Sequence, residues 1–202
     1  MGELKVGLEQ ARDRQGFDLY YGVDTFDKRY VVEHEDGQFA EASSPDKVKR
    51  IKTAILFMDG IVDMGETTFI DFGCGKGRAL IVASKFGFQS LVGIEFSPHA
   101  MGVCRNNLKK LSIPCSFFTE SISEIDYSTT LIRTKNVVIY AYNPTKLSII
   151  VESCNKLLEA YPNLRVFLIY TNPQGSISTA MIPTSELISR KRKQDIYQLS
   201  SN

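Results

Sequence analysis

Tryptophan is absent from this chain of 202 residues, which also has only four cysteines and two histidines. The cysteines are widely spaced and no two of them form a CxxC pair. This set is too sparse for a zinc site or for a disulfide framework. We therefore expect reduced thiols and no bound metal, as is typical of a cytoplasmic protein.

A strong net charge and a long apolar run are also missing. The 24 Lys and Arg residues nearly balance the 23 Asp and Glu residues, which leaves a net charge of +1. No overall field therefore attracts the chain to nucleic acid or to an anionic membrane. No apolar run approaches the roughly 18 residues of a membrane span, and the first residues lack the apolar region of a signal peptide. These absences predict a soluble, cytoplasmic protein with no membrane partner.

The residues that are present fit one globular domain with an extension at its start. Hydrophobic residues make up 43% of the chain and charged residues 23%, close to the averages for globular proteins. Residues 1–44 are polar and carry scattered Phe and Tyr without a clear period, so we expect an N-terminal extension laid over the rest. Residues 45–202 are expected to form the main domain.

Strands and helices alternate along this domain. Ser44 as a cap and Pro45 at the first helical position predict an opening helix that ends at Gly60 or Gly65. Apolar strands and amphipathic helices then follow in turn. We expect strands at 69–72, 91–94, 115–118, 137–140 and 166–170, helices at 76–86, from Ser97-Pro98 and from Pro144, and a final hairpin of 186–189 with 195–199. This alternation predicts a parallel sheet with helices on both faces.

A glycine-rich loop follows the first of these strands. This glycine loop, residues 71–78, reads DFGCGKGR. Ligands of open α/β sheets bind at such a place, outside the strand carboxyl ends and beside a helix N-terminus. A phosphate-binding P-loop would need Ser or Thr where Gly77 follows Lys76, and a dinucleotide fingerprint would need a small residue in place of Arg78. The remaining pattern is an acid, Asp71, followed by three alternate glycines.

A second acid, Glu95, ends the next strand, 18 residues after Gly77. A carboxylate has two acceptor oxygens, and a ribose has two adjacent hydroxyls that can donate to them, so we expect Glu95 to hold a ribose diol. Glu95 would also repel a 2′-phosphate, which argues against NADP. The alternative is that Asp71 and Glu95 only cap the ends of solvent-facing strands.

The glycine loop, with its strand and helix, resembles the S-adenosylmethionine site of class I methyltransferases. Residues 69–79 and 93–98 are similar to a bacterial group within that family. The resemblance implies an α/β, Rossmann-like fold with a mostly parallel seven-stranded sheet, helices on both faces and a C-terminal antiparallel hairpin. It also implies S-adenosylmethionine as cofactor and S-adenosylhomocysteine as product. The cofactor-binding residues that it implies are Asp71, Gly73, Cys74, Gly75, Gly77, Glu95 and Phe96.

Later strand ends carry further candidate contacts. The family often has Gly-Asp-Ala near the adenine at the position of 119–121, so Glu120 or the backbone of Ser121 is expected to contact the adenine amino group. Asn143-Pro144 matches the start of the Asn/Asp/Ser-Pro-Pro-aromatic motif that amino-directed class I methyltransferases have at this strand end, but Thr145 and Lys146 replace the second proline and the aromatic. The resemblance makes Asn143 and the preceding Tyr142 candidate acceptor contacts. Equally, Asn143 followed by Pro is an ordinary helix start. The aromatic that would stack on a flipped base is missing, which disfavours a nucleic-acid acceptor.

Residues 20–25, which read YYGVDT, resemble a segment upstream of the core in the same bacterial group. The ring of Tyr21 could stabilise a sulfonium through its π face, or Tyr20 and Tyr21 could simply pack the extension down. Asp24 is expected near the cofactor amine or the acceptor. We expect residues 1–44 to form a lid that excludes water from the methionine end of the cofactor.

The resemblance as a whole implies methyl transfer from S-adenosylmethionine by in-line displacement. The acceptor implied is a protein amine or a small molecule, and a related loop in the SET-lacking histone-lysine methyltransferases makes a protein lysine plausible. No strong general base stands out, so positioning and desolvation should supply most of the catalysis. A module that binds S-adenosylmethionine or a nucleotide without turnover, and a nucleic-acid methyltransferase, are the alternatives. The basic run 190–193 fits a solvated hairpin tip better than a site for an anionic partner.

Overall fold

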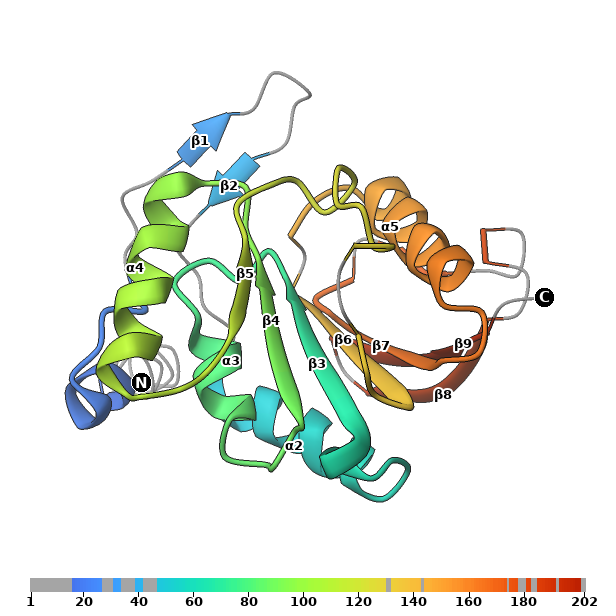
Figure 1. The fold of residues 1–202 in the computed structure, drawn as a ribbon, viewed down its shortest axis with the longest axis horizontal. Coiled ribbons are helices and arrows are strands. Elements are labelled where there is room, and N and C mark those ends of the chain that lie inside the picture. Colours follow the sequence, from blue (N-terminus) through green and yellow to red (C-terminus); the bar gives the residue numbers. More distant parts are fainter. Residues whose placement is uncertain are drawn as a thin grey trace, which may run out of the picture.

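A computed structural model describes residues 16–26, 31–33, 39–41, 47–129, 132–142, 144–173, 175–177, 181–182, 185–191 and 193–200. Its centre is a seven-stranded sheet in the order β5-β4-β3-β6-β7-β9-β8 (Figure 1). The strands are β3 (Thr67–Phe72), β4 (Ser90–Ile94), β5 (Ser116–Phe118), β6 (Asn136–Tyr142), β7 (Arg165–Thr171), β8 (Glu186–Lys191) and β9 (Gln194–Leu199). Strands β3 to β7 are parallel, whereas β9 pairs antiparallel with β7 and β8. The predicted fold class is confirmed.

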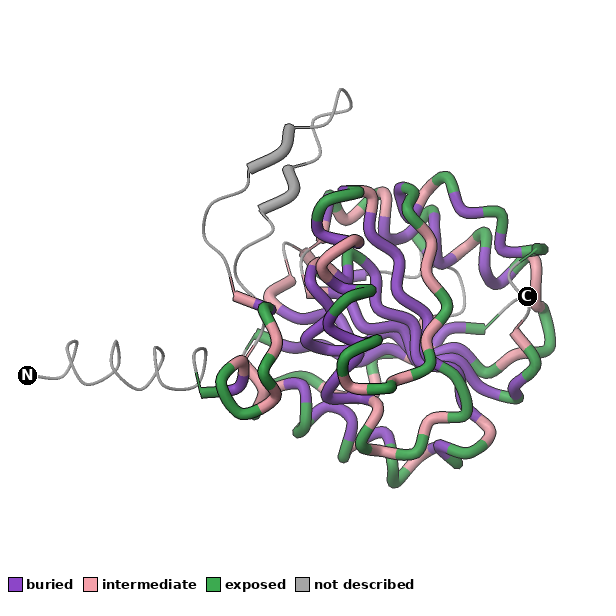
Figure 2. Tube along the Cα trace, turned by 60° about the vertical axis from the view of Figure 1, so that its left-hand side comes forward, coloured by how far each residue is buried: buried purple, intermediate pink, exposed green. Residues whose placement is uncertain are grey.

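Helices cover both faces of this sheet because successive strand residues point to opposite sides. On one face, Phe69 and the strand residues that point to the same side pack with the buried residues of α2 (Val48–Asp59), α3 (Arg78–Ala83) and α4 (Pro98–Lys110). On the other face, Ile70 and the strand residues that point to that side pack with α5 (Leu147–Ala160) and with apolar side chains that follow β5. Figure 2 shows the buried strands at the centre, with exposed residues around them.

The boundaries of α2 and α4 test the sequence signals for helix ends. α4 begins at Pro98 after Ser97, whose hydroxyl accepts a hydrogen bond from the N–H of Ala100, as predicted. α2 ends at Asp59 with Gly60 as its C-cap, which is the first of the two glycines predicted to end it. Its start differs, because α2 begins at Val48 after an extended Lys47, and the expected cap at residues 44–45 lies outside the described residues.

The predicted starts of α3 and α5 are wrong. Gly77 has a φ of 89°, which is not helical, so α3 begins only at Arg78. α3 ends at Ala83, after which the chain continues in a tighter turn with i→i−3 hydrogen bonds. α5 begins at Leu147 rather than Pro144, because Lys146 has an extended ψ of 144°. The N-cap of α5 is therefore Lys146.

The C-terminal hairpin differs slightly from expectation. β8 extends to Lys191, so Arg190 belongs to the strand and not to the turn. Its guanidinium donates two hydrogen bonds of 3.0 Å to the carboxylate of Asp195 on β9. Part of the basic run is thus paired within the hairpin.

The N-terminal extension contains more structure than its sequence indicated. Residues 16–21 are helical, and β1 (Val31–Glu33) pairs antiparallel with β2 (Phe39–Glu41). A short 3-10 helix, η1 (Met64–Glu66), leads into β3. Within the described ranges, no helix combines the length and apolar character needed to cross a membrane.

Candidate functional site

The glycine loop joins the carboxyl end of β3 to α3, and its backbone needs glycine at three positions. Gly73, Gly75 and Gly77 have φ values of 69°, 51° and 89°, in the left-handed region that other residues adopt only at a cost. A Cβ on Gly73 would lie 2.4 Å from the Cβ of Pro144, and one on Gly77 would lie 2.7 Å from the Sγ of Cys104. At Gly75, by contrast, no described residue beyond its two chain neighbours has an atom within 4 Å of the Cβ position. The loop is therefore packed at both ends and open in the middle.

Glu95 lies directly beside this opening. Its Oε2 accepts a hydrogen bond of 2.9 Å from the N–H of Gly75, and its Oε1 accepts one of 2.9 Å from the N–H of Ser97. Each oxygen keeps a further lone pair for a ligand. Burial raises the pKa of Glu95, while the N–H donors of Ser97 and Gly75 oppose that rise. The carboxylate can hold the loop in place and still accept two hydroxyl groups.

Asp71 is the second buried acid of the site. Asp71 is 4% exposed and Glu95 is 6% exposed, so the strand ends that carry these two acids do not face solvent. Burial, and then the nearby charge of Glu95, raise the pKa of Asp71 well above its usual value. None of the hydrogen bonds found between described residues ends on this carboxylate. A ligand that donates hydrogen bonds or carries positive charge would stabilise the ionised Asp71 carboxylate against both its burial and the charge of Glu95.

Cys74 contributes to the site through its backbone. Its N–H donates to the carbonyl of Ile94, and its carbonyl accepts from the N–H of Gly77 at 2.8 Å. Its Sγ lies in the core, 4.0 Å from the Sγ of Cys104. The contact with Cys104, together with burial, raises the pKa of the Cys74 thiol. The side chain therefore fixes the loop and does not face a ligand.

The remaining cofactor candidates lie after β4 and β5. Phe96 follows Glu95 and is half-buried, and the N–H of Glu95 donates to the carbonyl of Phe118 at the end of β5. Glu120 is exposed. Ser121 is buried, and its N–H donates to a carboxylate oxygen of Glu124 at 3.3 Å. A ligand that used the Ser121 N–H would have to compete with Glu124.

On the side where the acceptor is expected, the ends of β3 and β6 meet. Tyr142 ends β6 and is half-buried against the core on the α2–α4 face, while Asn143 lies outside the described residues. Pro144 approaches Gly73, as described above. Thr145 is buried, and its hydroxyl oxygen has no hydrogen-bond partner among the described residues. The sequence analysis missed Thr145, because a Thr after Pro gives no signal of its burial.

The structure brings Asp24 to the glycine loop but leaves Tyr21 elsewhere. The carboxylate of Asp24 lies 3.0 Å from the Nζ of Lys76. The ring of Tyr21 lies against Phe17, at 4.8 Å between centroids, and 5.7 Å from the Nζ of Lys85, beyond the end of α3. These contacts are those of a packing residue, the alternative that the sequence left open.

Three buried polar residues join the extension to the loop, and the sequence analysis missed their role. They are Lys76, Arg78 and Asn107, which are 6%, 3% and 6% exposed. Lys76 and Arg78 had served only to exclude other loop types. Asn107 carried a signal, since it lies three residues after Cys104, near the apolar face of α4.

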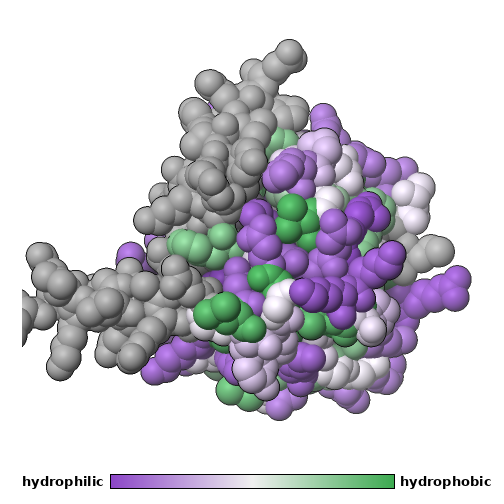
Figure 3. Space-filling model, turned by 90° about the vertical axis from the view of Figure 1, so that its left-hand side faces the viewer, coloured by the Kyte–Doolittle hydropathy of each residue, from purple (hydrophilic) through white to green (hydrophobic). Residues whose placement is uncertain are grey.

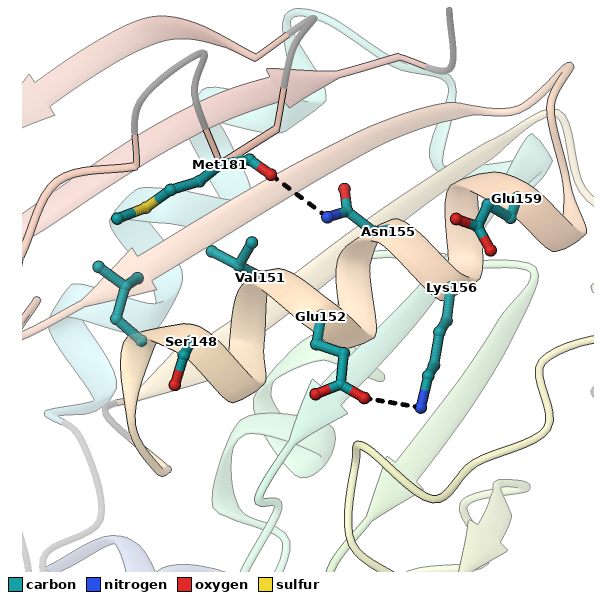
Figure 4. Close-up of a pocket in the computed structure, with 8 residues that line it drawn as sticks. Ser148, Val151, Glu152, Asn155, Lys156, Glu159 and Met181 are labelled. Atoms are coloured by element: carbon teal, nitrogen blue, oxygen red, sulfur yellow. Dashed lines mark hydrogen bonds and ion pairs between the residues drawn. The ribbon is translucent and has the colours of Figure 1, made fainter.

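Two of the cavities that described residues line lie outside the glycine loop. One of about 520 Å³ runs along the outer side of α5, where Val151 and Met181 line it together with the Glu152–Lys156 ion pair (Figure 4). The other, of about 580 Å³, is lined by residues of the 18–26 segment. Neither is lined by a residue of the glycine loop. Among the described residues, no group of three or more His, Cys, Asp or Glu side chains could hold a metal ion.

The strand order, the glycine loop after the first strand of the sheet and the acid after the next strand define a Rossmann-like fold of the methyltransferase type. Residues 64–188 match the family model for a methyltransferase domain, and the chain belongs to this family. The resemblance inferred from the sequence is confirmed.

Individual relatives are more distant. A ribosomal protein L11 methyltransferase of Cupriavidus metallidurans is 39% identical over 72 residues, which are 35% of this chain and 23% of that protein. A Methanocaldococcus jannaschii protein, provisionally named a protein N5-glutamine methyltransferase, is 26% identical over 80 residues, or 40% of this chain and 41% of that one. The chain thus spans less than half the length of these curated relatives.

Solved structures share the fold at low identity. Magnesium protoporphyrin IX methyltransferase from Synechocystis, solved with bound S-adenosylmethionine, has a TM-score of 0.53 and 12% identity, covering 76% of this chain and 79% of that one. The bifunctional kinase-methyltransferase WbdD has a TM-score of 0.55 and 16% identity, covering 78% of this chain and 40% of that chain.

Proposed function

We propose that this protein transfers a methyl group from S-adenosylmethionine to an amine of a protein or a small molecule and releases S-adenosylhomocysteine. Membership of the methyltransferase-domain family supports the reaction. One observation carries the cofactor assignment. The buried carboxylate of Glu95 accepts a hydrogen bond from the N–H of Gly75, where a Cβ would have no described residue within 4 Å except the two chain neighbours.

The chain's own residues would hold and orient the cofactor. When bound, S-adenosylmethionine supplies a methyl group on a positively charged sulfur. Glu95 accepts hydrogen bonds from the ribose hydroxyls, and Asp71 and the loop glycines line the cofactor between β3 and α3. Phe96, Glu120 and Ser121 form the adenine side. We assign no general base, so the protein's contribution is positioning and the exclusion of water.

Tyr142 and Asn143 are proposed to face the acceptor at the end of β6. One relative is named for ribosomal protein L11 and the other, provisionally, for protein glutamine, and these names support a protein nitrogen ahead of a small molecule. The net charge of +1 gives no support to a nucleic-acid acceptor. The N-terminal extension is proposed to cover the methionine end of the cofactor.

Binding and labelling experiments test this function. We expect calorimetry to detect S-adenosylmethionine and S-adenosylhomocysteine but not NAD, because Glu95 suits a ribose diol and the glycine loop lacks the dinucleotide pattern. Methyl-labelled donor, mixed with fractions of a cell lysate, should then label one fraction. Binding of NAD alone would refute the proposal. Binding of the methyl donor without a labelled product in any fraction would favour a non-catalytic module.

Replacing Asn143 by alanine should separate acceptor contact from a structural role. We expect methyl transfer to fall about ten-fold or more, while affinity for S-adenosylmethionine stays within about two-fold. Since α5 begins at Leu147, we expect no loss of a helix cap and a change in unfolding free energy below about 0.5 kcal/mol. Lys146→Ala is the control, because Lys146 makes no capping bond. Normal turnover in Asn143→Ala would remove Asn143 from the site.

A further inference from the structure

Residues 16–26, here called the strap, form a short helix and a turn beside the C-terminal end of α4 (Figure 1). The helix ends at Gly22, whose φ of 64° allows the N–H of Val23 to bond the carbonyl of Asp18 at 3.0 Å. Lys110, the last residue of α4, donates a hydrogen bond to the carbonyl of Gly22. On this side of the molecule, Figure 3 shows mostly hydrophilic residues with separate hydrophobic groups between them.

Asp18 and Arg78 anchor the strap to the first residue of α3. The carboxylate of Asp18 accepts hydrogen bonds from the N–H groups of Thr25 and Phe26, at 2.8 and 3.0 Å, and from the guanidinium of Arg78 at 3.3 Å. The Nε of Arg78 donates to the hydroxyl of Thr25 at 2.8 Å, and its guanidinium lies 5.0 Å from the ring centroid of Phe17. Because Arg78 is buried and always charged, it needs this anionic partner.

Asn107 ties the backbone of the strap to the backbone of the glycine loop. Its Oδ1 accepts from the N–H of Asp24 at 3.1 Å, and its Nδ2 donates to the carbonyl of Asp24 at 2.7 Å. The same Nδ2 donates to the carbonyl of Lys76 at 3.0 Å. One buried amide thus bonds three backbone groups from two segments that are 52 residues apart.

Asp24 and Lys76 form a second link at the same place. The side chain of Lys76 is 4% exposed, that of Asp24 is 60% exposed, and their charged atoms are 3.0 Å apart. Burying an ammonium without a partner is costly, so Asp24 favours the position of Lys76 seen here. Lys76 stands between Gly75, where the loop is open, and Gly77, whose position is fixed by Cys104.

We propose that Lys76 and Asn107 are positioning residues that couple the strap to the cofactor. When the strap is docked, Asp24 binds the side chain of Lys76 and Asn107 binds its carbonyl. These two contacts keep the neighbouring Gly75 in the conformation that leaves the loop open. The strap and the cofactor therefore bind cooperatively, and Asp24 acts on the cofactor through Lys76 rather than by direct contact. This inference rests on the proposed function, because it takes S-adenosylmethionine as the ligand of the loop.

A double-mutant cycle on the full chain tests this coupling, with S-adenosylhomocysteine as the probe in calorimetry. We expect Asp24→Asn and Lys76→Met each to weaken binding about ten-fold, and the double variant to bind about as weakly as either single one. Losses that multiply in the double variant would mean that Asp24 contacts the ligand directly. Unchanged binding in both single variants would also overturn the proposal. Lys135→Met is the control and should bind normally, because Lys135 lies in an exposed ion pair with Glu66, which belongs neither to the strap nor to the glycine loop.

Hydrogen exchange distinguishes coupling from a merely structural role, because a structural role would not make amide exchange in the strap depend on the ligand. Coupling is reciprocal, so the ligand should slow amide exchange at Asp24, Thr25 and Phe26 in the wild-type protein. In Lys76→Met this protection should be lost. Ligand binding without any change of exchange in the strap would refute the coupling and leave the proposed function intact. Failure of the wild-type chain to bind the probe would instead refute the proposed function.

Discussion

Replacing Glu95 by alanine should weaken the binding of S-adenosylmethionine by about 30- to 1,000-fold, which corresponds to about 2–4 kcal/mol. Two ribose hydroxyls would lose a charged acceptor in a buried site, where the exposed fraction of Glu95 is only 6%. Glu95→Gln keeps one acceptor oxygen and should show a smaller loss. Calorimetry with the product S-adenosylhomocysteine measures both variants.

Glu95→Ala also removes two hydrogen bonds to backbone N–H groups, so a control for stability is needed. Asp63 provides it, because its carboxylate also accepts from a glycine N–H, that of Gly65 at 2.8 Å, away from the glycine loop. Asp63→Ala should lose about 1 kcal/mol of unfolding free energy and keep its affinity. Affinity in Glu95→Ala that equals the wild-type value would remove Glu95 from the cofactor site.

The parts of the fold that the sequence predicted correctly are those set by local patterns. Residues 69–72 are apolar except for Asp71, and Ser97-Pro98 is a strong helix start, so β3 and α4 follow from neighbouring residues. The glycine loop was also recognisable, because its alternate glycines meet a backbone requirement within the loop itself.

The missed features depend on contacts between distant segments. Asn107 is 83 residues from Asp24, and Arg78 is 60 residues from Asp18, so no local pattern joins them. The start of α5 was misjudged because Pro suits a first helical turn, yet Pro144 instead packs over Gly73. A polar residue near an apolar helix face, such as Asn107, can be noticed in the sequence, but the residues that it bonds cannot be identified there.

Replacing Gly75 by alanine should weaken cofactor binding by about 5- to 150-fold, or about 1–3 kcal/mol, because the new methyl group would occupy space that the ligand needs. The protein itself should tolerate the change. Apart from the two chain neighbours, no described residue has an atom within 4 Å of the new Cβ, so we expect the folding cost to be that of a φ of 51°, about 1–2 kcal/mol. Calorimetry with S-adenosylhomocysteine and denaturant unfolding measure the two effects separately.

Gly87 offers a matched control for this variant. Its φ is 77°, and a Cβ there would also have no described residue within 4 Å except its chain neighbours, but Gly87 lies in the turn between α3 and β4. Gly87→Ala should therefore lose a similar amount of unfolding free energy and bind the cofactor normally. A selective loss of binding in Gly75→Ala would place the ligand against the middle of the glycine loop. Equal affinities in the two variants would contradict that placement, because the open space at Gly75 would then be ordinary solvent.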